Sequence, residues 1–175
     1  MKRLIHNAQI FDGSGKAPYR GDILIEDDRI ADIGKDIACN DAERIDAAGL
    51  AAAPGFIDTH SHSDLEILIN PEVLPKIMQG VTTEILGQDG VSMAPLPEKY
   101  ISPWRKNLAG LDGDSDEIDW HFRDTAGYLK MMEKASPGLN ECYLVPHGNI
   151  RMEAIGLDNR QPTAEEMQKM RSITQ

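Results

Sequence analysis

The sequence predicts an α/β protein in which a small antiparallel β unit precedes part of a parallel (β/α) barrel. Short apolar runs separated by Gly- and Asp-rich turns fill residues 3–33, a pattern that is typical of antiparallel strands. The composition changes at Pro54-Gly55, where small residues lead into an apolar stretch. Beyond that point strand-like and helix-like segments alternate, and such alternation predicts parallel strands joined by right-handed crossovers.

The N-terminal unit is expected to span residues 1–54. Its strands are predicted at residues 4–11, 21–26 and 30–33, because turn residues separate these apolar runs. A cluster of small residues ends in Pro54-Gly55 and places the domain boundary there. The second unit is therefore expected to cover residues 55–175.

The second unit is expected to alternate between strands and helices. Strands are predicted to begin at Phe56 and to cover residues 81–86 and 141–145, where apolar and β-branched residues gather. Helices are predicted over residues 71–79 after the N-cap Asn70, over residues 124–135, and from Thr163, which pairs with Glu166 in a capping box. The acidic run over residues 112–119 is expected to be a solvated loop without a chemical role. A complete eight-stranded barrel needs about 250 residues, whereas 175 − 55 = 120 residues remain after Gly55. This unit is therefore expected to provide three of the eight strands.

Charge and composition exclude several classes of protein. The chain has 18 Lys and Arg residues and 29 Asp and Glu residues, for a net charge of −11, so a cationic surface for nucleic acid or anionic membranes is not expected. No apolar run approaches the roughly 20 residues of a membrane span. The N-terminus lacks a secretory signal, so we expect a cytoplasmic protein. Cys39 and Cys142 have no metal-site spacing, and we expect both to be free thiols packed in the interior.

Two histidines follow the apolar pair Phe56-Ile57. His60 and His62 are two residues apart, and such side chains on a β-strand point to the same face with Cα atoms about 6.5 Å apart. Two imidazoles on one face can bind one metal ion. Asp58 shares this parity, as does Asp64 if the strand persists that far, so their carboxylates could contact the metal or a ring nitrogen of a ligand histidine. An isolated His-x-His pair is common, but this one lies at the carboxyl end of a predicted barrel strand, where barrels carry their active sites. The sequence therefore predicts a metal centre.

The segment Pro54-Gly55-Phe56-Ile57-Asp58-Thr59-His60-Ser61-His62 resembles the amidohydrolase superfamily. Two further segments are similar to its N-acyl-D-amino-acid deacylase (D-aminoacylase) branch: Gln79-Gly80-Val81-Thr82-Thr83 with Asp89-Gly90-Val91-Ser92-Met93-Ala94-Pro95, and Pro146-His147-Gly148-Asn149-Ile150-Arg151. The resemblance covers most of the chain. It implies half of a composite β-sandwich in the N-terminal unit, a metal-bearing (β/α) barrel beside it, and hydrolysis of an amide bond in a small-molecule N-acyl amino acid.

The resemblance also implies a third metal ligand in the loop after the second barrel strand. Members of the branch commonly carry a cysteine in an Asn-Cys-Gly stretch there, whereas this chain has Gln88-Asp89-Gly90. Asp89 takes the place of the cysteine, and a carboxylate with two imidazoles suits Zn²⁺ first, with Mn²⁺ or Fe²⁺ as alternatives. The other interpretation is that Asp89 only caps the following turn.

Two residues after the third predicted strand are candidates for binding the substrate. His147 and Arg151 would lie near the mouth of the barrel, where they could hold the substrate carboxylate or a neighbouring loop. Structural roles are equally open for both, because an Arg in such a loop often only pairs with an acidic neighbour.

The length of the chain departs from the family. Members are much longer, and their later barrel strands supply further metal-binding histidines and the aspartate that acts as general base. We therefore expect an N-terminal fragment that is inactive alone and whose catalytic base lies outside this chain. Two rival interpretations stay open: a cyclic amidase such as a dihydroorotase-like or hydantoinase-like enzyme, and a non-catalytic metal-binding module.

Overall fold

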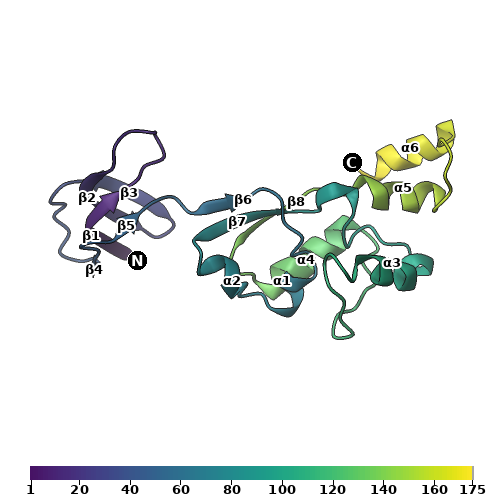
Figure 1. The fold of residues 1–175 in the computed structure, drawn as a ribbon, viewed down its shortest axis with the longest axis horizontal. Coiled ribbons are helices and arrows are strands. Elements are labelled where there is room, and N and C mark those ends of the chain that lie inside the picture. Colours follow the sequence, from purple (N-terminus) through teal and green to yellow (C-terminus); the bar gives the residue numbers. More distant parts are fainter. Residues whose placement is uncertain (175) are drawn as a thin grey trace. The chain divides into compact units, whose positions relative to one another are not determined.

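The computed structural model describes residues 1–174, which divide after Pro54 into two compact units. The first unit contains a five-stranded sheet (Figure 1). Its strands are β1 (Lys2–Ile10), β2 (Tyr19–Glu26), β3 (Arg29–Gly34), β4 (Glu43–Asp46) and β5 (Ala51–Ala52). The antiparallel pairing of β1 with β2 and of β2 with β3 confirms the three strands expected from the sequence. The short strands β4 and β5 both pair with β1 in parallel.

The core of the first unit forms along β1. Ala8 and Ile10 are buried in one cluster with Ala47, and the two-residue spacing of Ala8 and Ile10 is that of one face of a strand. A bulge interrupts the pairing of β1 with β2 at Asn7, which adopts a φ of 63°. The carboxylate of Asp22 accepts the Asn7 backbone N–H at 3.0 Å, so the donor that leaves the ladder still has a partner.

The second unit contains a parallel sheet in the order β6 (Phe56–Asp58), β7 (Val81–Leu86) and β8 (Asn140–Tyr143). Its helices are α1 (Glu66–Ile69), α2 (Leu74–Ile77), α3 (Ile101–Leu108), α4 (Thr125–Ala135), α5 (His147–Ile155) and α6 (Ala164–Ile173), and single 3₁₀ turns occur at η1 (Gln88–Gly90) and η2 (Glu98–Tyr100). Parallel strands alternating with helices confirm the α/β class. Figure 1 shows α1, α2 and α4 along the same side of the three strands. Over residues 1–174, no helix is long and apolar enough to cross a bilayer.

Aromatic and aliphatic side chains fill the space between this sheet and its helices. Tyr128 of α4 is fully buried between Phe122 and Tyr143, with ring centroids 5.6 and 4.9 Å away. Edge-on and tilted aromatic pairs at these distances are favourable beyond the area that they bury. Other fully buried residues of this cluster are Leu65, Ile67, Leu86, Met93, Ala94, Leu96 and Leu108.

The helices match the sequence in part. Asp124 caps α4 by accepting the Gly127 N–H, and Thr163 forms the expected capping box with Glu166 at the start of α6. The helix expected over residues 71–79 is wrong in extent, since α2 covers only Leu74–Ile77. Proline has no N–H and is accepted only in the first turn, so Pro75 delays the start of this helix. The sequence prediction did not include α1, α3 and α5.

The two cysteines have different surroundings. Cys39 is buried, as expected, whereas Cys142 is exposed, so the expectation of an interior thiol is wrong for Cys142. Side chains alternate along a strand, and on β8 the neighbours Glu141 and Tyr143 are partly buried while Cys142 lies on the other face. Burial of Tyr143 against Tyr128 therefore fixes Cys142 on the exposed side.

Candidate metal centre

Three side chains converge beyond the carboxyl ends of β6 and β7. The Nε2 atoms of His60 and His62 each lie 3.2 Å from Oδ2 of Asp89. The ligand atoms of the three residues lie within 4.8 Å of one another, as a shared metal ion requires. The His62 side chain is 18% exposed, whereas those of His60 and Asp89 are 58% and 59% exposed. The group is therefore open to solvent on one side and can be reached by an ion.

The two histidines do not lie on a strand, contrary to the expectation from their spacing. Strand β6 ends at Asp58, whose side chain accepts the His60 N–H at 3.2 Å. Local side-chain bonds of this kind compete with sheet pairing, so the strand stops two residues early. Beyond the end of β6, one further hydrogen bond links this segment to β7: the Ser61 N–H donates to the Ile85 carbonyl at 3.2 Å. Both imidazoles still turn toward Asp89.

Asp89 reaches the histidines because of the backbone after β7. Gly87 and Asp89 both have positive φ, 74° and 57°, and a Cβ on Gly87 would lie 2.0 Å from the Leu144 carbonyl oxygen. Glycine is therefore required at position 87. Over residues 1–174, the Asp89 carboxylate has hydrogen-bond contacts to the two imidazoles and to no backbone N–H. The His60 and His62 contacts lower the pKa of Asp89. This geometry favours the ligand interpretation over the turn-cap interpretation.

The donor set is chemically suited to a transition metal. Two neutral imidazoles and one carboxylate are ligands that zinc, manganese and iron accept. The side chains already converge without rearrangement of the backbone. These three residues therefore fit one divalent ion, with remaining positions open to water or to ligands from elsewhere.

A charged cluster lies beside the histidine segment. Glu84 of β7 is fully buried and accepts from Lys76 Nζ, from Ser61 Oγ at 2.6 Å and from Ser63 Oγ at 3.1 Å. Lys76 also donates to Asp58 at 3.0 Å. Burial lowers the pKa of Lys76, but its bonds to Glu84 and Asp58 outweigh burial and raise it. Ser61 stands between the two histidines in sequence, so this cluster anchors the segment that carries them.

Asp58 has surroundings other than those expected, whereas Asp64 lies near the His62 ring as expected: ligand atoms of His62, Asp64 and Asp112 lie within 4.8 Å of one another. Asp58 accepts from Lys76 and from a backbone N–H rather than from a histidine ring. Asp64 is 1% exposed and accepts from Gly87 N–H at 3.0 Å and from the Ser92 hydroxyl. Burial raises the pKa of Asp64. Asp64 therefore ties the histidine segment to the loop that carries Asp89.

The expectation of a solvated loop over residues 112–119 is wrong at Asp112. Its side chain is completely buried, and Oδ1 lies 3.3 Å from His62 Nδ1. Burial and the nearby Asp64 carboxylate raise the pKa of Asp112 to about 7, against a lowering by His62. Asp112 is four residues after the buried Leu108 and donates its N–H to the Leu108 carbonyl at 2.9 Å. This helical spacing from Leu108 is the one signal in the sequence that could have revealed its burial.

The two predicted substrate-binding residues do not behave alike. His147 is the first residue of α5 and is exposed. Arg151 donates to the carbonyl oxygens of Asp158 and Arg160, at 2.8 and 2.6 Å. Arg151 thus holds the loop after its own helix, which is the neighbouring-loop role rather than a substrate contact.

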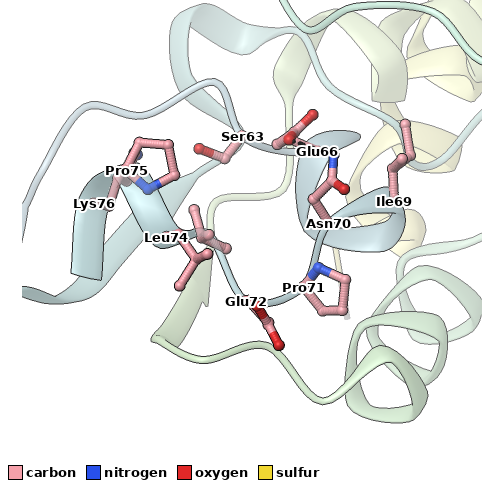
Figure 2. Close-up of a pocket in the computed structure, with 10 residues that line it drawn as sticks. Ser63, Glu66, Ile69, Asn70, Pro71, Glu72, Leu74, Pro75 and Lys76 are labelled. Carbon is pink, nitrogen blue, oxygen red and sulfur yellow. Dashed lines mark hydrogen bonds between the residues drawn. The ribbon is translucent and has the colours of Figure 1, made fainter. Parts of the chain in front are cut away.

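A cavity of about 580 Å³ opens beside α1 and α2 (Figure 2). Ser63 and Lys76 line it and also belong to the charged cluster around Glu84. Neither of the paired histidines nor Asp89 is part of its lining. The cavity in Figure 2 is therefore separate from the three convergent ligands.

Comparisons with known proteins place the chain in a family. A model of the amidohydrolase family, Amidohydro_3, matches residues 43–173. The chain is 38% identical to an N-acyl-D-glutamate deacylase of Alcaligenes xylosoxydans xylosoxydans over 168 residues, which is 95% of this chain and 33% of that protein. A dihydroorotase of Syntrophotalea carbinolica is 50% identical, but over only 62 residues, or 35% of this chain.

Solved structures agree with the sequence matches. An N-acyl-D-glutamate deacylase from Bordetella bronchiseptica, solved with zinc and a phosphonate inhibitor, superposes with a TM-score of 0.82 and 36% identity over 97% of this chain. A structure of D-aminoacylase with a binuclear metal centre gives a TM-score of 0.84 and 32% identity. The chain spans about a third of the length of these proteins. It belongs to the amidohydrolase family, where its relatives include N-acyl-D-amino-acid deacylases.

Proposed function

We propose that this chain is the N-terminal part of a longer metal-dependent enzyme that hydrolyses the amide bond of N-acyl-D-amino acids. Residues 1–54 would contribute strands to a composite β-sandwich. Residues 55–175 would supply the first three βα units of a (β/α)₈ barrel, with β6, β7 and β8 as its neighbouring strands. The convergence of His60, His62 and Asp89 beyond the strand ends is the observation that carries this proposal.

In the proposed enzyme His60, His62 and Asp89 hold the metal. The donor set suits Zn²⁺ first, with Mn²⁺ or Fe²⁺ as alternatives, and the solved N-acyl-D-glutamate deacylase relative binds zinc. A bound divalent ion supplies Lewis-acid chemistry and makes a water molecule nucleophilic near neutral pH. The exposed side of the three residues leaves room for the amide carbonyl. The general base belongs to the part of the protein beyond this chain.

Residues of this chain also shape the surroundings of the metal. Ser61, held by Glu84 and Lys76, fixes the backbone between the histidines. Asp64 holds the loop of Asp89 through Gly87 and Ser92. His147, exposed at the start of α5, remains a candidate for contact with the substrate carboxylate. Arg151 is engaged by its own loop, and we assign it no substrate contact.

Hydrolysis of N-acyl-D-amino acids by the full-length protein tests this function. Purified full-length protein with added zinc should release the amino acid from N-acetyl-D-glutamate or another N-acetyl-D-amino acid, and chelation should stop the release. His60→Ala and His62→Ala should lower zinc affinity and activity together. The matched control is His121→Ala, because His121 is exposed and pairs only with Asp119 in the described structure. The 175-residue chain alone should be inactive.

Two outcomes of the same assay would favour the rival functions. Hydrolysis of dihydroorotate or a hydantoin, with no turnover of N-acyl-D-amino acids, would favour a cyclic amidase. Zinc binding by the histidines without hydrolysis of either substrate class by the full-length protein would favour a non-catalytic metal-binding module. The short extent of the dihydroorotase match favours the deacylase over the cyclic amidase.

A further inference from the structure

The imidazole of His62 lies between two carboxylates. Its Nε2 atom is 3.2 Å from Asp89 Oδ2, and its Nδ1 atom is 3.3 Å from Asp112 Oδ1. The two carboxylates differ in their access to water, since the Asp89 side chain is 59% exposed and that of Asp112 is completely buried. One nitrogen of His62 therefore faces the open site, and the other faces the interior.

Hydrogen bonds to α3 hold the segment that contains Asp112. Its backbone N–H and that of Leu111 both donate to the Leu108 carbonyl at the end of α3, at 2.9 and 2.8 Å. Arg105 of α3 binds the side chains of Asp114 and Asp116 at 2.7 and 2.6 Å. The segment after α3 is thus bonded to that helix on both sides of Gly113.

Trp120 makes a further hydrogen bond within the loop that follows α3. The indole N–H of Trp120 donates to the Ser115 carbonyl at 2.8 Å. The Arg105 guanidinium lies over the same indole, 5.1 Å from the ring centroid. The acidic run 112–119 is therefore an ordered loop that holds the Asp112 carboxylate in the interior, although its other acidic side chains are exposed.

His60 has no comparable support. In residues 1–174 the only charged group within 4 Å of its ring nitrogens is Asp89, and its side chain is 58% exposed. The two histidines of the pair are therefore not equivalent. Only His62 has an interior carboxylate on the nitrogen that faces away from Asp89.

We propose that Asp112 is a positioning residue that accepts the Nδ1–H of His62 and so directs the Nε2 lone pair toward the metal site. A neutral imidazole has one N–H and one lone pair, and the partner of the N–H decides which nitrogen is free to bind. The inference rests on the proposed function, because it takes His62 as a metal ligand. It adds a residue from the loop after α3 to a site that otherwise derives from the ends of β6 and β7.

Zinc affinity of full-length variants tests the inference. Competition with a chelator should show affinity lowered about 10- to 100-fold by Asp112→Ala, the range found when a carboxylate behind a ligand histidine is removed. Asp112→Asn should lose less, because its amide oxygen can still accept the Nδ1–H. Asp119→Asn is the matched control: this exposed side chain in the same loop pairs with His121, and its loss should change affinity less than twofold.

A second measurement reports on His62 directly. In zinc-loaded protein labelled with ¹⁵N-histidine, the His62 Nδ1 proton should be visible by NMR and protected from exchange with water. The signal should be lost in Asp112→Ala and kept in Asp119→Asn. Because the wild-type spectrum alone shows whether the proton is protected, this measurement stands even if Asp112→Ala fails to fold.

The outcomes separate the inference from the proposed function. Unchanged zinc affinity in both Asp112 variants, or a freely exchanging His62 Nδ1 proton in the wild type, would overturn the role of Asp112 and leave the deacylase proposal intact. Conversely, an effect of Asp112 on zinc affinity in a protein that hydrolyses no N-acyl-D-amino acid would support the positioning role and contradict the deacylase function.

Discussion

Replacing Lys76 by methionine should destabilise the second unit strongly. The Nζ atom of Lys76 contacts the carboxylates of Glu84 and Asp58 and the hydroxyl of Ser61. Glu84 is fully buried, so the loss of Lys76 leaves a buried carboxylate that keeps the hydroxyls of Ser61 and Ser63 as donors but has no cation beside it in the described residues. Breaking a buried ion pair by removing one partner typically costs about 3–5 kcal/mol. Because the Lys76 side chain is 23% exposed, we expect about 3 kcal/mol, the lower end of this range.

Urea unfolding followed by tryptophan fluorescence measures this effect. Both tryptophans of the chain, Trp104 and Trp120, lie in the second unit, so they report on its unfolding. The double variant Lys76→Met/Glu84→Gln should recover at least half of the loss, since the amide introduced in place of the carboxylate is neutral and can still accept from the two serine hydroxyls. The control Lys106→Met removes an exposed lysine of α3 and should stay within about 0.5 kcal/mol of the wild type.

The double variant decides whether the reasoning holds. If Lys76→Met/Glu84→Gln is as unstable as Lys76→Met, the loss comes from packing of the lysine stem and not from the uncompensated Glu84 charge. A cost below about 1 kcal/mol for Lys76→Met would place the pair in the range of surface ion pairs and would also refute the argument.

Two further predictions concern individual carboxylates. In the full-length protein, Asp89→Ala should lower the metal content, Asp89→Cys should retain it, and Asp89→Asn should lose part of it. Elemental analysis measures the metal content, and an unchanged value in Asp89→Ala would end the hypothesis that Asp89 is a ligand. Burial and the neighbouring Glu84 raise the pKa of Glu141 from 4.5 to about 8. A pKa raised in the folded state favours the protonated form, so the wild type should lose stability as the pH rises from about 4.5 through about 8. Glu141→Gln should weaken this dependence, and equal slopes of Tm between pH 5 and 9 in both proteins would contradict it.

Most of the strands and two of the helix starts could be predicted from the sequence, because local residue patterns determine them. Apolar runs bounded by turn residues located β1, β2, β3 and β7 within a few residues. The cap at Asp124 and the capping box at Thr163 fixed the starts of α4 and α6. These features depend on residues that are neighbours in sequence, so one amino-acid sequence is sufficient to predict them.

Features that depend on particular side-chain contacts, whether local or between distant segments, were missed. The end of β6 depends on a bond from His60 N–H to the Asp58 side chain, and the position of α2 depends on Pro75. Asp58 was expected near a histidine ring, but Lys76, eighteen residues later, takes its carboxylate. Sequence parity gives the face on which a side chain lies but not the partner that it meets.

The acidic run after α3 shows the same limit in one stretch of chain. Asp112, Asp114 and Asp116 are identical in type and alternate in sequence, yet the first has a fully buried side chain while those of the other two are 42% and 95% exposed. Composition predicts a solvated loop for all three. The difference arises because Asp112 follows Leu108 at helical spacing and is drawn into the core with it. Once buried beside His62, a carboxylate must find a partner, and the imidazole of a metal-ligand candidate is the group in reach. The burial of one leucine in α3 therefore links the core of the second unit to the orientation of His62, the proposed metal ligand.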